Sequence, residues 1–187
     1  MRRPSSAAPA ATLADLEKEL SGAGDRERAL NLAWLFKTGP GGYAERDQFL
    51  GTRVPVQRRI ARRFLHLHRD DLECLLESPI HEHRFTAAEI LVAQYEPAAP
   101  PEAARIFRFY LKHAKRFNNW DLVDTSAPYI AGAHLLNRPR DILRKLARSK
   151  NLWERRIAIV TTLAFIKERQ LEDTLRSLIC FSAITTI

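Results

Sequence analysis

The residues best suited to chemistry lie in the segment 119–124, which brings an indole and two carboxylates together. If Asn119 caps a helix, Trp120 and Asp124 are four residues apart and share one face of that helix. The helix is otherwise mostly apolar, so we expect Asp124 to be partly desolvated, where an unpaired carboxylate is costly. We expect Arg156 to be its partner. An aromatic ring and an acid beside strong cations suggest a cationic substrate or a charged backbone as the ligand.

Two interpretations of Asp124 stay open at this point. In one, the carboxylate acts on a substrate in a functional site. In the other, Asp124 and Arg156 form a buried ion pair that only links two repeats. Asp121 has a purely structural explanation as a first-turn charge that complements the helix dipole. Trp120, taken by itself, has a purely structural explanation as a core aromatic residue.

A repeated spacing connects this segment with two others. Arg84, Trp120 and Arg156 lie 36 residues apart (84 to 120 and 120 to 156), each near an expected helix start. A period in the thirties to forties with two amphipathic helices per unit is typical of an α-solenoid. We therefore expect these three side chains to line one groove, with Asp124 one turn below Trp120.

Hydrophobic periodicity predicts helices along the whole chain and no convincing strand, so the expected fold class is all-α. Glycine and proline at residues 39–42 break the pattern after an opening helix pair. The expected helices cover residues 13–20, 30–35, 56–68, 71–77, 81–95, 101–117, 120–136, 141–149, 152–168 and 171 onward.

The composition is that of a folded, basic protein. Of its 187 residues, 45% are hydrophobic and 28% charged, which is enough for one domain with a substantial core. The formal net charge of +8 and the pI of about 9.9 favour a polyanionic partner. Cys74 and Cys180 have no metal or redox spacing, as is usual in a reducing cytoplasm. No segment has the form of a signal peptide or a membrane span, so we expect a cytoplasmic, nucleoid-associated protein without membrane contact.

The two ends of the chain differ from its middle. Residues 1–11 are expected to form a disordered tail, followed by a single domain over residues 12–187. Residues 177–187 have no charged side chain, although a solenoid needs a polar capping element to be soluble. We therefore expect this domain to lack its C-terminal repeat or repeats.

Lys and Arg gather in three clusters near expected helix ends. In a solenoid such ends lie along one edge, where the clusters are placed to follow a phosphate backbone. The alternative is that each cluster is an ordinary solvated helix face, but recurrence at similar repeat positions favours nucleic acid. The candidate DNA-binding residues are Arg53, Arg84, Lys112, Lys115, Arg116, Arg148, Arg155 and Arg156.

Other motifs argue against several classes of protein. The Gly-Pro-Gly-Gly run at 39–42 lacks the Lys-Ser/Thr that follows a phosphate-cradling loop, so a turn is expected. The histidines at 66 and 68, and at 81 and 83, are two residues apart and cannot chelate one metal from a helix. No serine or cysteine has the context of a nucleophile. We predict no metal and no cofactor.

Five stretches that follow one another in order carry a family resemblance. They span about residues 30 to 175, and their ordered co-occurrence makes the match specific. The Trp-Asp-x-Val-Asp and Trp-x-x-Arg segments would be weak alone. The stretches resemble the AlkD-type DNA alkylation repair proteins, which are HEAT-like-repeat DNA glycosylases. They are Phe36–Gly41, Phe49–Pro55, Ser78–Arg84, Asn119–Asp124 and Leu152–Ala158.

The resemblance implies a right-handed α-solenoid of HEAT-like helix pairs with a concave basic face, in a protein that is a monomer when full length. It implies removal of N3- and N7-alkylated purines from duplex DNA, without drawing the lesion into a pocket. Trp120 matches the family's aromatic residue at the deoxyribose, Asp124 its carboxylate that stabilises oxocarbenium charge and positions water, and Arg156 its basic residue at the phosphate. No general acid is required, because alkylation has already made the purine a good leaving group.

The chain departs from the family near its C-terminus. Family members continue with helices that carry a second active-site tryptophan, and no segment here matches it. Trp34 and Trp153 do not replace that residue by position. Two alternative functions stay open: a non-catalytic HEAT-like protein that binds nucleic acid, and a protein-interaction scaffold, which the uncharged C-terminal stretch favours.

Overall fold

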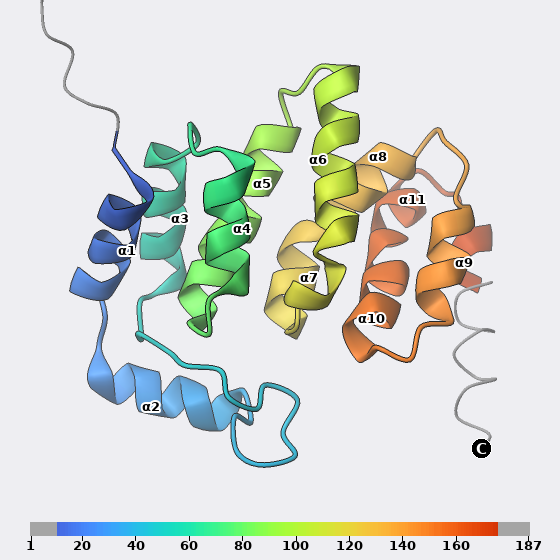
Figure 1. Ribbon diagram of the computed structural model, residues 1–187. Helices are drawn as coiled ribbons and strands as arrows, with labels where there is room; N and C mark the ends of the chain where they lie inside the picture. The colour runs from blue at the N-terminus through green and yellow to red at the C-terminus, as the bar shows by residue number, and fades with distance from the viewer. Residues whose placement is uncertain (1–10, 176–187) are drawn as a thin grey trace, which may run out of the picture.

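The fold is built from α-helices packed in two rows (Figure 1). The computed structural model describes residues 11–175. Within that range the only bridge between extended segments joins Gln48 and Ile80, so the predicted all-α class is confirmed. None of the described helices is long and apolar enough to cross a bilayer. The expected tail, apart from residue 11, and the uncharged stretch 177–187 lie outside the described residues.

Helices α3, α5, α7 and α10 lie side by side in one row, and α4, α6 and α9 form the other (Figure 1). Helix α2 runs across the lower edge of the molecule in this view. A 3-10 turn, η1, and a π-helical segment, η2, complete the set. The bounds are α1 (Leu13–Gly22), α2 (Arg26–Leu35), α3 (Val54–Arg63), α4 (Arg69–Glu77), α5 (His81–Tyr95), α6 (Pro100–Lys112), η1 (Ala114–Arg116), α7 (Trp120–Ser126), η2 (Pro128–Gly132), α8 (Ala133–Leu135), α9 (Asp141–Ala147), α10 (Leu152–Thr161) and α11 (Leu163–Lys167).

Two asparagines set the starts of α7 and α10. Asn119 has an extended backbone (φ −151°, ψ 157°), and its side chain accepts a hydrogen bond from the amide of Trp120 at 2.8 Å. Asn151 accepts from the amides of Trp153 at 2.9 Å and Glu154 at 3.1 Å. These bonds satisfy amides that the first turn of a helix leaves without partners. Trp120 is therefore the first residue of α7, and Trp153 the second of α10.

The helix predicted over residues 120–136 is continuous but changes form halfway. Pro128 has no amide hydrogen, and the amide of Gly132 donates to the carbonyl of Ala127 at 2.8 Å, five residues back. A Cβ on Gly132 would lie 2.6 Å from the Cβ of Ala164 and 2.9 Å from the carbonyl of Thr161. The glycine therefore allows η2 to approach the end of α10 and the start of α11 closely.

The core runs without interruption from α1 to α10. Its largest fully buried side chain is Tyr110 of α6. The phenolic oxygen of Tyr110 lies 3.1 Å from the hydroxyl oxygen of Ser126 in α7. Burial raises the pKa of Tyr110, which keeps the phenol neutral. A smaller cluster of Leu135, Leu143 and Phe165 packs the end that carries α8, α9 and α11. The helices of both rows are thus held by shared apolar side chains.

The equal spacing of Arg84, Trp120 and Arg156 does not reflect equivalent positions, so this expectation was wrong. Helices α5, α7 and α10 begin at His81, Trp120 and Leu152, which are 39 and 32 residues apart (81 to 120 and 120 to 152). Arg84 is therefore the fourth residue of its helix, Trp120 the first and Arg156 the fifth. The different positions of the three residues within their helices offset the unequal helix starts and give the spacing of 36.

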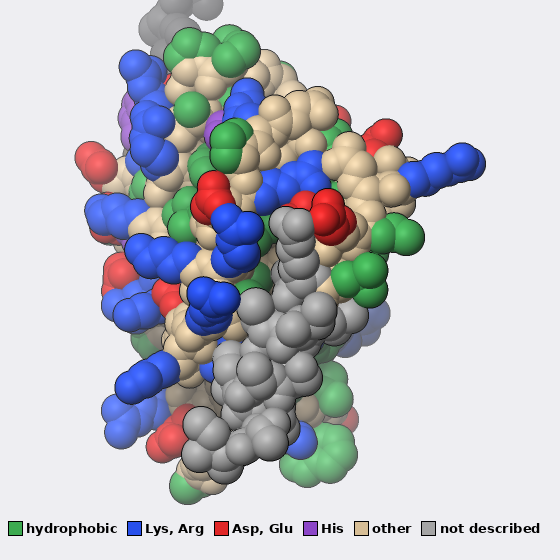
Figure 2. Space-filling model, turned by 90° about the vertical axis from the view of Figure 1, so that its right-hand side faces the viewer, with side chains coloured by type: hydrophobic (Ala, Val, Ile, Leu, Met, Phe, Trp, Pro, Cys, Tyr) green, Lys and Arg blue, Asp and Glu red, His purple; other side chains and the backbone are tan. Residues whose placement is uncertain are grey.

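Lys and Arg side chains are unevenly spread over the end of the molecule that carries α9 and α11. Figure 2 shows them gathered in a column along one edge of this face. The exposed cations of α6 and α9 include Arg105, Arg108, Arg144 and Lys145, of which Arg105 pairs with Glu102 and Arg144 with Asp141.

Candidate functional site

The predicted partnership of Asp124 and Arg156 is confirmed by two hydrogen bonds. Arg156 donates from Nε to one carboxylate oxygen at 2.9 Å and from Nη2 to the other at 2.7 Å. The Asp124 side chain keeps 41% of its surface exposed and the Arg156 side chain 38%. The pair is therefore not the buried bridge of the purely structural interpretation. It fixes the orientation of a carboxylate that solvent and ligands can still reach.

Trp120 is supported on one side and open on the other. Its indole lies flat on the ring of Phe36, with centroids 5.5 Å apart and an interplanar angle of 5°. Phe36 is buried, whereas Trp120 keeps 42% of its surface exposed. Trp120 is thus not an ordinary core aromatic residue, because its free surface is available to a ligand.

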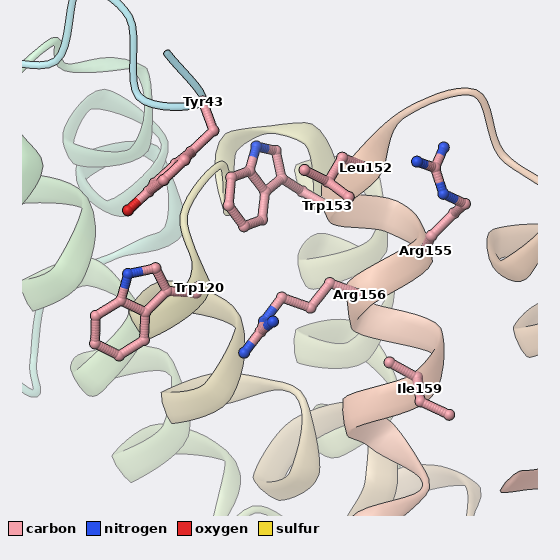
Figure 3. Close-up of a pocket in the computed structure, with 7 residues that line it drawn as sticks. All are labelled: Tyr43, Trp120, Leu152, Trp153, Arg155, Arg156 and Ile159. Carbon is pink, nitrogen blue, oxygen red and sulfur yellow. The ribbon is translucent and has the colours of Figure 1, made fainter. Parts of the chain in front are cut away.

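An open hollow of about 470 Å³ adjoins Trp120 and Arg156 (Figure 3). Trp153, which does not match the family's second active-site tryptophan by position, lines this hollow. So does Tyr43, which sequence reasoning missed because it lies on a loop with no recognisable motif of its own. The lining residues are Tyr43, Trp120, Leu152, Trp153, Arg155, Arg156 and Ile159.

A buried polar cluster lies behind Phe36 and ties α5 to α7. Nε2 of His81 is 2.8 Å from the carboxylate of Asp121, and Nδ1 is 3.7 Å from that of Asp47. Burial alone lowers the pKa of His81, but attraction to Asp121 and Asp47 outweighs it, so the pKa is raised from its ordinary 6.5. Asp121, expected to act only as a first-turn charge, therefore also holds the helix that carries Trp120.

Arg84 does not lie in the groove where it was expected. Its side chain is buried, donates from Nη1 to the carbonyl of Ser78 at 2.7 Å, and lies 2.5 Å from Asp47 through Nη2. Burial lowers the pKa of this guanidinium, and Asp47 opposes the effect. Arg155 makes the corresponding contact with Ser149 at 2.9 Å, so it is the counterpart of Arg84. A buried guanidinium offers no surface to a DNA phosphate, and Arg84 belongs to the interior.

With this geometry established, comparison with known proteins identifies the family. The family model described as "DNA alkylation repair enzyme" matches residues 16–179 of the chain. The protein belongs to this family. A search of curated proteins found no match. Membership of the DNA alkylation repair family indicates a function in DNA repair and an interaction with DNA.

For a DNA alkylation repair protein, cations that are free of carboxylates matter most, because they can neutralise phosphates without breaking an ion pair. Arg53, Lys115 and Arg148 are exposed, and none makes an ion pair within residues 11–175. These three predicted DNA-binding residues are therefore free to contact a phosphate backbone.

The other predicted cations of this DNA alkylation repair protein are already engaged. Lys112 lies 3.0 Å from Glu73, and Arg116 donates from Nε to Glu77 at 2.7 Å. Arg155 donates to the carbonyl of Ser149 at 2.9 Å and to that of Lys150 at 3.0 Å. Since these acceptors of Arg155 are neutral, its charge is oriented without being cancelled.

Proposed function

We propose that the protein is a DNA glycosylase that excises N3- and N7-alkylated purines from duplex DNA. The observation that carries this proposal is the arrangement of Asp124, Arg156 and Trp120. An oriented carboxylate and an exposed indole stand together on α7, with a guanidinium from α10 beside them. This combination suits a reaction in which positive charge develops on a sugar.

The reaction needs little assistance from the protein at the leaving group. An N7-alkylated purine already carries positive charge, so cleavage of the glycosidic bond releases a neutral base and leaves an electron-poor sugar. The protein gains most by stabilising that sugar in the transition state. Asp124 supplies negative charge for this purpose, and the face of Trp120 supplies the negative side of an aromatic quadrupole.

Arg156 holds Asp124 in place while keeping capacity for other contacts. A carboxylate has about four lone-pair sites and the two hydrogen bonds use two of them, so Asp124 can still accept a bond from the attacking water. Arg156 uses Nε and Nη2 for Asp124, which leaves Nη1 without a partner among residues 11–175. In the proposal Nη1 contacts the phosphate of the lesion nucleotide.

The proposed binding mode uses the helix rows as a rigid support. We propose that they form a right-handed solenoid of HEAT-like pairs that binds duplex DNA as a monomer through a concave basic face. Arg53, Lys115 and Arg148 are the proposed phosphate contacts, because they are exposed and free of carboxylates. Lys112, Arg116 and Arg155 join them in the proposal, although the first two must first leave a carboxylate.

The experiment that tests the proposal is incubation of the protein with duplex DNA that contains a single N7-methylguanine. Free N7-methylguanine and an abasic site cleavable by alkali are the expected products. The same duplex with an unmodified guanine is the control. Binding of the methylated duplex without any release of base would reject the proposed activity.

A second candidate is DNA binding without excision. It is favoured by the same bidentate pair, because a carboxylate that gives both oxygens to one guanidinium has part of its charge neutralised. In that case DNA affinity falls steeply with salt and no abasic product forms.

A further inference from the structure

The hollow beside Trp120 has aromatic side chains on two walls (Figure 3). Trp120 stands on one side. On the other, Tyr43 and Trp153 meet edge to face, with centroids 5.8 Å apart and an interplanar angle of 69°. Phe36 covers one face of Trp120, so the indole surface left open to a ligand is the other face and the ring edge.

This surface is apolar and open to solvent. Leu152 is 50% exposed, Trp120 is 42% exposed, and Tyr43 and Trp153 are partly exposed. A volume of about 470 Å³ is within the range of about 300–1,000 Å³ typical of small-molecule sites. A gathered apolar patch of this kind on a folded surface usually marks a binding site.

Two arginines line the same hollow: Arg156 reaches toward Trp120, and Arg155 lies beyond Leu152 (Figure 3). Arg155 is oriented by the carbonyls of Ser149 and Lys150 and faces no carboxylate partner within residues 11–175. Arg156 keeps Nη1 free beside its bonds to Asp124. Flat aromatic walls with an uncancelled cation are what a nucleotide needs, since the base stacks and the phosphate pairs with the charge.

We propose that this hollow binds one unstacked nucleotide of DNA, with Tyr43 and Trp153 against its base and Arg155 at its phosphate. The inference goes beyond the proposed function, which needs only Trp120, Asp124 and Arg156 at the sugar and no base withdrawn from the helix. It rests on the proposed function for a single premise, that the protein binds DNA.

Fluorescence and affinity together test the inference. The probe is a duplex with one bulged, unpaired nucleotide, and the fully paired duplex is its reference. In a Trp34→Phe background Trp120 and Trp153 are the only tryptophans, and a further Trp153→Phe change separates their signals. We expect the bulged duplex to quench Trp153 and the paired duplex to leave its emission nearly unchanged. No quenching of Trp153 by the bulged duplex would overturn the inference.

The affinity measurement uses alanine substitutions of Tyr43, on the loop that follows α2, and of Trp153, on α10. Tyr43→Ala and Trp153→Ala should each weaken binding of the bulged duplex by about 5- to 150-fold, the usual cost of one lost base–aromatic stack, and change binding of the paired duplex much less. Trp34→Ala is the matched control, because Trp34 lies on α2, is 82% exposed and does not line the hollow. Trp153→Phe retains a ring and should recover most of the affinity. Equal effects on both duplexes would contradict the inference.

The outcomes separate the two proposals. If the parent protein releases no base but Trp153 responds to the bulged nucleotide, the glycosylase proposal fails and this inference stands. If base is released while Tyr43→Ala and Trp153→Ala change neither release nor affinity, this inference fails and the glycosylase proposal stands. If neither duplex binds, both fail. Thermal melting of each variant shows whether it is folded under the conditions of the assay.

Discussion

The ring of Phe36 lies flat against the indole of Trp120, with only 5° between the two planes. Phe36 follows the last residue of α2, and Trp120 is the first residue of α7. The contact therefore joins a distant part of the chain to the proposed active site. Because the stack covers one side of the indole, it also decides which side a ligand can reach.

Removing this support should damage the site more than the fold. Phe36→Ala is expected to cost about 3 kcal/mol of unfolding free energy, as for other truncations of buried phenylalanine. It should also reduce the rate of base release by about a hundredfold, since a misplacement of about 1 Å at a reacting centre has that effect. Thermal melting and single-turnover base release measure the two effects.

Phe165→Ala is the matched control for this prediction. Phe165 is fully buried, but it belongs to the separate cluster with Leu135 and Leu143. The Phe165→Ala variant should lose about as much unfolding free energy as Phe36→Ala, and below its melting temperature it should keep the parental rate of base release. Equal losses of rate in the two variants would show that Phe36 has no special relationship with Trp120.

His81 should make stability depend on pH in a defined direction. Its pKa is raised in the folded protein from 6.5, since Asp121 and Asp47 favour the charged form more than burial and Arg84 disfavour it. Its stabilising contribution is therefore fully present below pH 6.5 and is lost as the pH rises through the folded-state value. The difference in unfolding free energy between the parent and His81→Gln, from denaturant titrations across this range, should shrink as pH increases.

His83 provides an internal comparison of opposite sign. Burial lowers its pKa from 6.5, so the neutral form is favoured in the folded protein and stability is lost as the pH falls through 6.5. The stability difference between the parent and His83→Gln should therefore shrink as pH decreases. Parallel pH profiles for the two variants would rule out the assignment of a charged His81 and a neutral His83.

The salt dependence of DNA binding should distinguish exposed from buried cations. Arg148→Ala and Lys115→Ala should each reduce the slope of log K against log salt by about 1, because each removes one phosphate contact. Arg84→Ala should leave that slope unchanged and cost about 3–5 kcal/mol of stability, since it removes the closest cation of the buried Asp47. A reduced slope for Arg84→Ala would place that residue at the DNA after all.

Arg156→Lys should show whether the geometry of the pair with Asp124 matters. Lysine keeps the charge but cannot make two parallel hydrogen bonds to a carboxylate. Base release should fall by about a hundredfold, with little change in duplex affinity at constant salt. Arg58→Lys, at an exposed pair with Glu89, is the control and should behave like the parent. A parental rate in Arg156→Lys would mean that charge alone is sufficient.

The sequence predicted the helices well because their signals are local. The periodicity over residues 81–95 and the asparagine at 119 gave the bounds of α5 and the start of α7 as the structure has them. The change to a π-helical turn between Pro128 and Gly132 was missed. It accompanies the close approach of Gly132 to Ala164, which is seen only in the folded protein. The spacing of 36 was misleading because Arg84, Trp120 and Arg156 occupy different positions in helices whose starts are unequally spaced.

The site was predicted in part. Asp124 and Arg156 were paired correctly, because a carboxylate in the second turn of an apolar helix needs a cation. Phe36 and Tyr43 were missed as site residues, since their loop reaches Trp120 and Trp153 only in the folded protein. The Phe36–Gly41 stretch did appear among the segments that carry the family resemblance, and this was the signal that could have found Phe36.

The decisive measurement compares Asp124→Asn with the parent protein on duplex DNA that contains N7-methylguanine. Asparagine has nearly the same shape and carries no charge, so duplex binding should be retained while single-turnover release of N7-methylguanine falls by at least about a hundredfold. Asp141→Asn, at an exposed position on α9, controls for the loss of one negative charge. Release of base by Asp124→Asn at the parental rate would contradict the proposed role of this carboxylate and, with it, the mechanism.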